Sequence, residues 1–172
     1  MIYLSVKSNI YLFADDTKLF REIKDNVDQV LLQEDLDVVM KWSKVWLLNF
    51  NTDKCVYMQI GKQKLLYDYY LSSDGENNKL KLVDEVKDLG ILFDNELKFE
   101  NHISDTINKA NSIIGIIRRS YRYLNITNFT PLYKAMVRSY FDYASSITCP
   151  IKKEYIKSIE DVQRRATKLV PE

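Results

Sequence analysis

The spacing of apolar residues changes near residue 100, and this change constrains the fold more than any other feature of the chain. Beyond that point, apolar residues recur every three or four positions, as on one face of an α-helix. The first such series is Ile103, Ile107, Ala110, Ile114, Ile117 and Tyr121. Before residue 100, apolar runs are mostly short and bounded by turn-forming residues, which is typical of strands. We therefore expect an α+β chain divided into residues 1–100 and 101–172.

Two further helices are predicted in the second part. Thr130 and Pro131 place a capping residue before a proline, a pattern typical of a helix start. The inward face of that helix is expected to comprise Leu132, Met136, Tyr140 and Ala144. A last helix is predicted from Lys153 to Val170, with Tyr155, Ile159, Val162, Ala166 and Leu169 facing inward. Three consecutive amphipathic helices predict a small bundle.

The first part predicts one long helix among short strands. The helix is expected from Asn26 to Leu48, with Asp25 as its N-cap. Its inward stripe is Leu32, Leu36, Val39, Trp46 and Phe50, and its exposed face includes Asp28, Gln29, Gln33, Glu34 and Asp37. Strands are predicted near Cys55–Ile60, Leu65–Leu71, Lys79–Val83 and Lys87–Phe93, with a turn over Ser72–Asn78. We expect these strands to form an antiparallel sheet with the first hairpin.

That first hairpin is predicted by "YLFADDTKLF", residues 11–20. Apolar runs Tyr11–Ala14 and Thr17–Phe20 flank Asp15 and Asp16, a spacing that indicates two strands joined by a two-residue turn. Aspartate tolerates the left-handed backbone of tight turns. We therefore expect both carboxylates at the hairpin tip, outside the packed strands.

Two adjacent carboxylates form a compact site for a hard divalent cation. Mg²⁺ prefers oxygen ligands and commonly uses one or two carboxylates together with substrate phosphates. Two such ions stabilise the attacking and leaving oxygens in phosphoryl transfer. The alternative for Asp15 and Asp16 is an ordinary solvated turn, which the dipeptide alone favours.

Charge is distributed unevenly along the chain, although the total net charge is +1. Residues 1–100 hold 13 Lys and Arg against 18 Asp and Glu, whereas residues 101–172 hold 12 against 6. The second part also contains all the arginines except Arg21. Such asymmetry indicates that the C-terminal part meets a polyanion. The alternative is the solvated surface of ordinary helices.

Several classes of protein and site are not indicated. The sequence has no run of 18 apolar residues and no signal-peptide pattern, so we expect an intracellular protein without a membrane partner. It has neither a dinucleotide-binding glycine fingerprint nor a phosphate-binding Walker loop. Cys55 and Cys149 are interpreted as free thiols. His102 is the only histidine and is not expected to bind metal, and Trp42 and Trp46 are expected in the core.

The segment "LFADDTKLF" resembles the catalytic hairpin of reverse transcriptases from retrotransposons without long terminal repeats, the jockey-like and chicken-repeat-like families. Their aromatic-x-Asp-Asp motif matches Phe13, Ala14, Asp15 and Asp16. "LLQEDLDVVMKWSKVWLLNFNTDKC" resembles the palm helix and its following loop, and "VKDLGILFDNELKFENHI" the next hairpin. "KANSIIGIIRRS", "LYKAMVRSYFDYAS" and "IEDVQRRATKLV" resemble the thumb. The similarity extends in family order from about Asn9 to Val170.

This resemblance implies part of a polymerase palm in residues 1–100 and a helical thumb in 101–172. The implied activity is RNA-directed DNA synthesis with two Mg²⁺ ions, a template–primer of RNA and DNA, and deoxynucleoside triphosphates. Asp15 matches the metal-binding carboxylate and Asp16 its less directly engaged neighbour. The remaining implied site residues are Lys54 near the incoming triphosphate, Leu89 and Gly90 in a primer-grip-like turn, and Arg118, Arg119, Arg122, Arg164 and Arg165 on nucleic acid. For Lys54, a solvated loop lysine remains the alternative.

The chain departs from the family pattern at its start. The family carries a further metal-binding aspartate and the fingers before the Asp-Asp hairpin, whereas Asp15 is the first acidic residue here. We therefore expect the isolated chain to be inactive as a polymerase. Two alternatives remain, a non-catalytic nucleic-acid-binding remnant of a retroelement and a plain α+β interaction domain.

Overall fold

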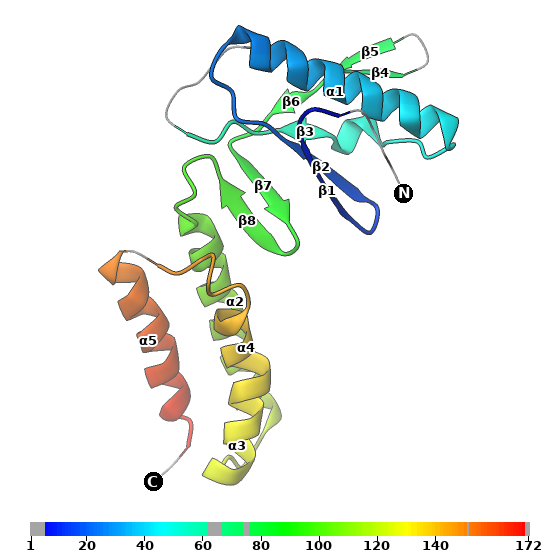
Figure 1. Ribbon diagram of the computed structural model, residues 1–172. Helices are drawn as coiled ribbons and strands as arrows, with labels where there is room; N and C mark the ends of the chain where they lie inside the picture. Colours follow the sequence, from blue (N-terminus) through cyan, green and yellow to red (C-terminus); the bar gives the residue numbers. More distant parts are fainter. Residues whose placement is uncertain (1–5, 62–66, 74–75, 151, 171–172) are drawn as a thin grey trace. The chain divides into compact units, whose positions relative to one another are not determined.

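The protein combines helices with small, mostly antiparallel strand pairs (Figure 1). The computed structural model describes residues 6–61, 67–73, 76–150 and 152–170. The chain divides into two compact units, Met1–Asp84 and Glu85–Glu172. The prediction of one strand near Lys87–Phe93 is wrong, because the chain reverses at Leu89 and Gly90 within this segment. The resulting hairpin belongs with the helical unit.

In its described residues, the first unit contains one long helix, one 3₁₀ helix and six short strands. In chain order these are β1 (Asn9–Phe13), β2 (Asp16–Phe20), α1 (Asn26–Val45), the 3₁₀ helix η1 (Thr52–Lys54), β3 (Val56–Tyr57), β4 (Tyr70–Ser73), β5 (Glu76–Lys79) and β6 (Lys81–Leu82).

These strands do not form the single antiparallel sheet that the sequence predicted. Across the described ranges of the unit they make three separate pairs, of which β1–β2 and β4–β5 are antiparallel and β3–β6 is parallel. The predicted turn over Ser72–Asn78 is also wrong in extent, since Ser72 and Asn77 are paired strand residues. Composition misled here because serine and asparagine favour turns but are accommodated in an exposed strand pair. Leu65 and Leu66 of the predicted strand lie outside the described residues.

Helix α1 begins as predicted. The Asp25 carboxylate accepts hydrogen bonds from the backbone N–H groups of Val27 and Asp28 at 2.9 and 3.1 Å, which satisfies two donors that the first helical turn leaves free. Met40 of the helix packs in one buried cluster with Tyr69, Leu71 and Leu80. Leu32 and Leu36 of the helix and Phe50 after it lie at the edge of this cluster.

Two residues predicted on the exposed face of α1 face the protein instead. Gln29 is only 5% exposed. The Gln33 amide donates to the Tyr70 carbonyl and accepts from the Tyr70 N–H, both at 2.9 Å, and so pairs with β4 as a neighbouring strand would. Amphipathic spacing assigns polar residues to solvent, but an amide that completes a strand's hydrogen bonds is stable at an interface.

The end of α1 differs from the prediction because the helix stops at Val45. The Leu48 N–H donates to the Ser43 carbonyl and the Leu47 N–H to the Lys44 carbonyl, the bonding pattern of a Schellman motif. Leu47 occupies the left-handed position of this motif at φ 56°. Trp46 is 65% exposed, so its predicted place in the core is wrong. Trp42 is half-buried, 6.4 Å from the Trp46 ring.

The second unit is a hairpin followed by helices. Its elements are β7 (Glu85–Asp88), β8 (Ile91–Asp94), α2 (Glu100–Ser120), α3 (Ile126–Leu132), the π-helical segment η2 (Tyr133–Arg138), α4 (Ser139–Asp142) and α5 (Lys153–Thr167). The predicted inward residues of α2 and α5 pack together, since Ala110, Ile114 and Ile117 form one core with Val162 and Ala166. The exception is Tyr121, which is 44% exposed.

The helix predicted to start at Thr130 starts earlier. Asn125 and Asn128 form a reciprocal capping box, and Pro131 lies inside the helix. The buried residues are Phe129 and Val137, whereas Met136 and Tyr140 are 38% and 39% exposed. The asparagine cap outcompetes the Thr-Pro signal because it satisfies two backbone N–H groups at once.

Across the described residues, no helix is both long and apolar enough to cross a membrane.

Candidate active-site hairpin and nucleic-acid surface

The turn of the hairpin that carries the two aspartates has the predicted length but lies one residue earlier than the sequence predicted. Phe13 pairs with Asp16, so the two-residue turn consists of Ala14 and Asp15. Ala14 has a positive φ of 52°, and this left-handed residue allows the chain to reverse immediately after Phe13. Asp16 is therefore the first paired residue of β2, and the prediction that both aspartates form the turn is wrong by one position.

Both carboxylates are available to a ligand. Asp15 and Asp16 are exposed. Within the described part of the chain, neither side chain makes a hydrogen bond or an ion pair. A carboxylate without an intramolecular partner loses only water when it binds a cation. Cation binding by Asp15 or Asp16 would therefore break no bond within the described part of the protein.

The acidic pair matches only part of a metal site. In the described ranges, no group of three or more His, Cys, Asp or Glu side chains is positioned to hold a metal ion. Two carboxylates nonetheless fit Mg²⁺ when water and substrate phosphates complete its six oxygen ligands. Asp15 and Asp16 therefore fit a substrate-dependent magnesium site better than a site made of protein ligands alone.

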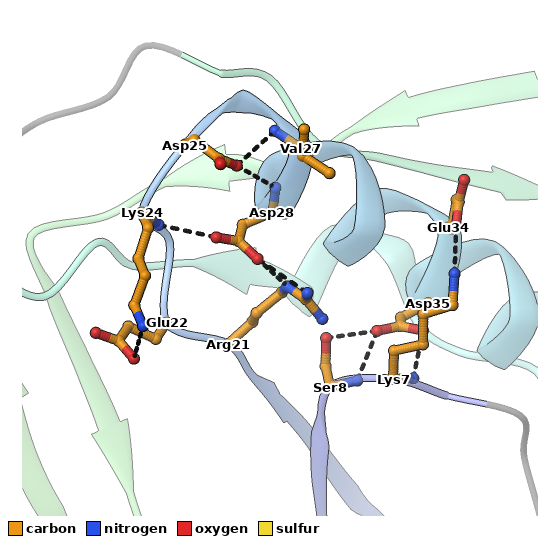
Figure 2. Close-up of polar contacts among 10 residues, drawn as sticks. All are labelled: Lys7, Ser8, Arg21, Glu22, Lys24, Asp25, Val27, Asp28, Glu34 and Asp35. Carbon is orange, nitrogen blue, oxygen red and sulfur yellow. Dashed lines mark hydrogen bonds and ion pairs between the residues drawn. The ribbon is translucent and has the colours of Figure 1, made fainter.

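The foot of the hairpin is held to α1 by a buried carboxylate. Asp35 is 2% exposed. It accepts hydrogen bonds from the Lys7 and Ser8 backbone N–H groups, both at 2.8 Å, and from the Ser8 hydroxyl at 2.5 Å. Figure 2 shows Lys7 and Ser8 directly before β1, facing the helix. These bonds fix where β1 begins.

A second contact holds the end of β2 to the first turn of the same helix. The Arg21 guanidinium donates from Nε and Nη2 to one Asp28 oxygen at 3.1 and 2.9 Å, and the Lys24 N–H donates to the other oxygen at 3.0 Å. The Lys24 N–H and then the Arg21 side chain hold the pKa of Asp28 below its ordinary value. Both ends of the hairpin are thus bonded to α1 at its foot (Figure 2). The aspartates lie at the other end of the hairpin, around its turn.

Sequence reasoning missed the role of Asp35 and assigned Asp28 to the exposed face. A signal for Asp35 was present, because it falls next to Leu36 and three residues after Leu32 on the packed side of the helix. An acidic residue at an inward helical position needs donors in the folded protein. Which donors these are depends on the tertiary structure.

Lys54 is the last residue of η1 and is exposed. No hydrogen bond or ion pair joins it to Asp15 or Asp16 within the described residues. Its placement near a triphosphate stays a prediction.

Leu89 and Gly90 form the two-residue turn between β7 and β8, where Asp88 pairs with Ile91. Both have positive φ, 45° and 85°, as a type I′ hairpin turn requires. The Tyr143 hydroxyl donates to the Leu89 carbonyl at 2.5 Å and so ties the turn to the helical part of the unit.

The predicted nucleic-acid-binding arginines gather because α2 and α5 run parallel (Figure 1). At one end, Glu100 forms an ion pair with Lys152 at 2.5 Å, directly before α5. At the other end, Ile117 shares a core with Ala166. The exposed arginines Arg118, Arg119, Arg122, Arg164 and Arg165 therefore occupy the same end of the unit.

The charges at this end are only partly neutralised. Arg164 pairs with Asp161 at 2.8 Å, and the Arg122 guanidinium lies 5.9 Å above the Tyr123 ring. Residues 106–141 contain no Asp or Glu. Basic side chains also complement the carbonyl ends of helices, so the end of the unit suits either that role or a polyanion.

Comparisons with protein-family models, with curated proteins and with solved structures find no match to this chain.

Proposed function

We propose that this chain is part of a non-LTR retrotransposon reverse transcriptase, comprising a portion of the palm and the thumb. One observation supports the proposal: Asp15 and Asp16 lie exposed, without a partner among the described residues, at the tip of a tight hairpin whose foot is bonded to a long helix. That arrangement presents two oxygen-ligand groups at a defined position. It suits a site completed by a nucleotide's phosphates.

In this proposal each group has a separate task. Asp15 and Asp16 hold Mg²⁺, which when bound neutralises phosphate charge and lowers the barrier to nucleotidyl transfer. Lys54 offsets charge on the leaving pyrophosphate. The arginines at the shared end of α2 and α5 bind phosphates of the template–primer without reading its sequence.

The isolated chain is expected to be inactive. Two-metal catalysis needs further carboxylate ligands, and the described residues bring no third acidic side chain to the hairpin tip. The test is extension of a primed RNA template with Mg²⁺ and deoxynucleotides. Extension by the wild-type chain, lost in the Asp15→Ala, Asp16→Ala double variant, would contradict this expectation.

The metal site can be tested without polymerase activity. Fe²⁺ bound in place of Mg²⁺ reduces added hydrogen peroxide to hydroxide and a hydroxyl radical, which cuts a nearby nucleic-acid backbone, and ascorbate returns the resulting Fe³⁺ to Fe²⁺. We expect localised cuts in a bound template–primer, lost in both Asp15→Asn and Asp16→Asn. The matched control is Glu160→Gln, which replaces an exposed acidic residue on α5. This variant should produce the same cuts as the wild-type chain. Cutting that survives both aspartate substitutions would refute the assignment.

A second candidate is a nucleic-acid-binding protein without catalysis. The observation that favours it is the long acid-free segment together with the arginine-rich end of the helical unit. Both candidates predict duplex binding that weakens steeply with salt. Replacing Arg118, Arg119 and Arg165 with glutamine should reduce the slope of log K against log salt by roughly one for each phosphate that the variant no longer binds. Lys41→Gln on α1 is the control. Metal-dependent cutting separates the two candidates.

A further inference from the structure

A pocket of about 290 Å³ opens in the second unit beside the turn between β7 and β8. Its walls come from that turn, from α2, and from α4 and the residue after it. Its lining includes Gly90, His102, Thr106, Lys109, Tyr140 and Tyr143. None of the described lining residues is acidic. Its volume lies near the lower end of the roughly 300–1,000 Å³ typical of small-molecule sites.

One wall of the pocket is a row of hydrogen-bond donors. Thr106 and Lys109 follow His102 by four and seven residues. All three therefore lie on one face of α2. The His102 Nδ1 accepts a hydrogen bond from the Leu92 N–H at 3.3 Å, so a neutral ring carries its proton on Nε2. Burial and then Lys109 lower the pKa of His102, while Asp105 acts in the opposite direction. At neutral pH this wall offers an N–H, a hydroxyl and an ammonium group.

The other wall is aromatic. Tyr140 and Tyr143 are 39% and 56% exposed. The Tyr143 ring is fixed by its bond to the Leu89 carbonyl. A Cβ atom at position 90 would lie in van der Waals contact with the Tyr143 ring, at 3.7 Å, so Gly90 lies directly beside this aromatic wall. The π-helical segment η2 ends directly before α4, and such segments occur frequently at functional sites.

We propose that this pocket is a subsite for one nucleotide unit of a polynucleotide strand. The phosphate accepts hydrogen bonds from Lys109, Thr106 and the His102 Nε2–H, and the sugar or base covers the two tyrosine rings. A strand is favoured over a free anion because two tyrosine rings beside the donors offer a surface for a sugar or base, and because residues 106–141 contain no Asp or Glu that would repel neighbouring phosphates. The inference rests on the proposed function, in which a template–primer is the ligand.

Nuclear magnetic resonance on the ¹⁵N-labelled full chain tests the subsite directly. Titration with a single-stranded deoxytetranucleotide should shift the Gly90 amide and the His102 ring signals. Deoxyadenosine monophosphate should shift them at higher concentration, and inorganic phosphate least. Lys109→Gln should weaken tetranucleotide binding about three- to tenfold. Lys134→Gln is the matched control, because it removes the same charge from an exposed position of η2 outside the pocket.

The subsite is overturned if the tetranucleotide leaves the Gly90 and His102 signals unmoved, or if the two lysine variants weaken binding equally. Equal shifts with inorganic phosphate overturn it too, because a general anion site would explain them. If the chain binds the primed duplex but the Gly90 and His102 signals do not move, the subsite is rejected and the proposed function is not. If these signals move but the chain neither binds the duplex nor supports cutting, the proposed function is rejected and the subsite is not. Thr106→Val, which removes a donor but no charge, should weaken binding and provides a second variant.

Discussion

The buried carboxylate of Asp35 should be a major source of stability in the first unit. It is 2% exposed and accepts three hydrogen bonds, two from backbone N–H groups and one from the Ser8 hydroxyl. In Asp35→Asn one acceptor oxygen becomes an NH₂ group that faces a donor. A hydrogen bond to a charged group contributes about 1.5–3 kcal/mol, and an unsatisfied buried donor costs about 1–3 kcal/mol. We expect Asp35→Asn to lower the free energy of unfolding by about 2–4 kcal/mol.

Urea denaturation followed by tryptophan fluorescence measures this change in the correct unit. Both tryptophans, Trp42 and Trp46, lie at the C-terminal end of α1, whereas the second unit has none. A change of that size lowers the urea midpoint by roughly 1–3 M. Far-ultraviolet circular dichroism, which also reports the helices of the second unit, should retain a transition at the wild-type midpoint.

Two neighbouring substitutions calibrate the result. Ser8→Ala removes only the hydroxyl donor and should cost about 1 kcal/mol. Glu34→Gln removes an adjacent but exposed carboxylate, paired with the Lys7 ammonium at 3.4 Å, and should cost under about 1 kcal/mol. If Asp35→Asn shifts the fluorescence midpoint no more than Glu34→Gln does, the hairpin foot is not held by this carboxylate.

Three further outcomes follow from the geometry. Leu47→Gly should stabilise α1 by about 1 kcal/mol, because glycine removes the cost of a left-handed leucine at φ 56°; an unchanged or lower thermal midpoint would contradict this. Burial opposes ionisation of Asp94, but the Lys98, Phe99 and Glu96 N–H groups outweigh it and hold its pKa below 3.8. The stability from Asp94 is therefore present above pH 3.8 and lost as the pH falls through the lower folded pKa, and Asp94→Asn should flatten acid unfolding there. Amide hydrogen exchange should be faster in Asn9–Phe20 than in α2, because Tyr11, Leu12 and Phe13 are all more than half exposed; slower exchange in the hairpin would refute this.

Local patterns predicted the elements better than their partners. The apolar spacing of α2 and α5 and the Asp25 cap were visible in sequence and are confirmed. The existence of the first hairpin is also confirmed, because two apolar runs so close together pair most easily with each other. Its turn was displaced by one residue, since a left-handed Ala14 carries no compositional signal. The helix at Ile126 was missed because two capping signals compete within six residues.

In the candidate site too, the sequence predicted individual residues better than the contacts between them. Asp15 and Asp16 could be singled out from ten residues, because an acidic pair inside an apolar run has few structural explanations. The clamp on the hairpin could not, since Asp35 meets donors 27 and 28 residues away. The common end of the arginines depends on the parallel packing of α2 and α5, which helical periodicity does not encode.

Local sequence predicts which segments are helical, though not always where they begin and end, because helix formation depends on neighbours within a few positions. It also fixes which side chains carry acidic and basic charge. Which of those side chains meet depends on tertiary packing. The Tyr143 hydroxyl reaches the Leu89 carbonyl across 54 residues, and His102 receives the Leu92 N–H across a chain reversal. Such contacts depend on the packing of whole elements, and a backbone donor or acceptor has no side-chain identity that a sequence could reveal.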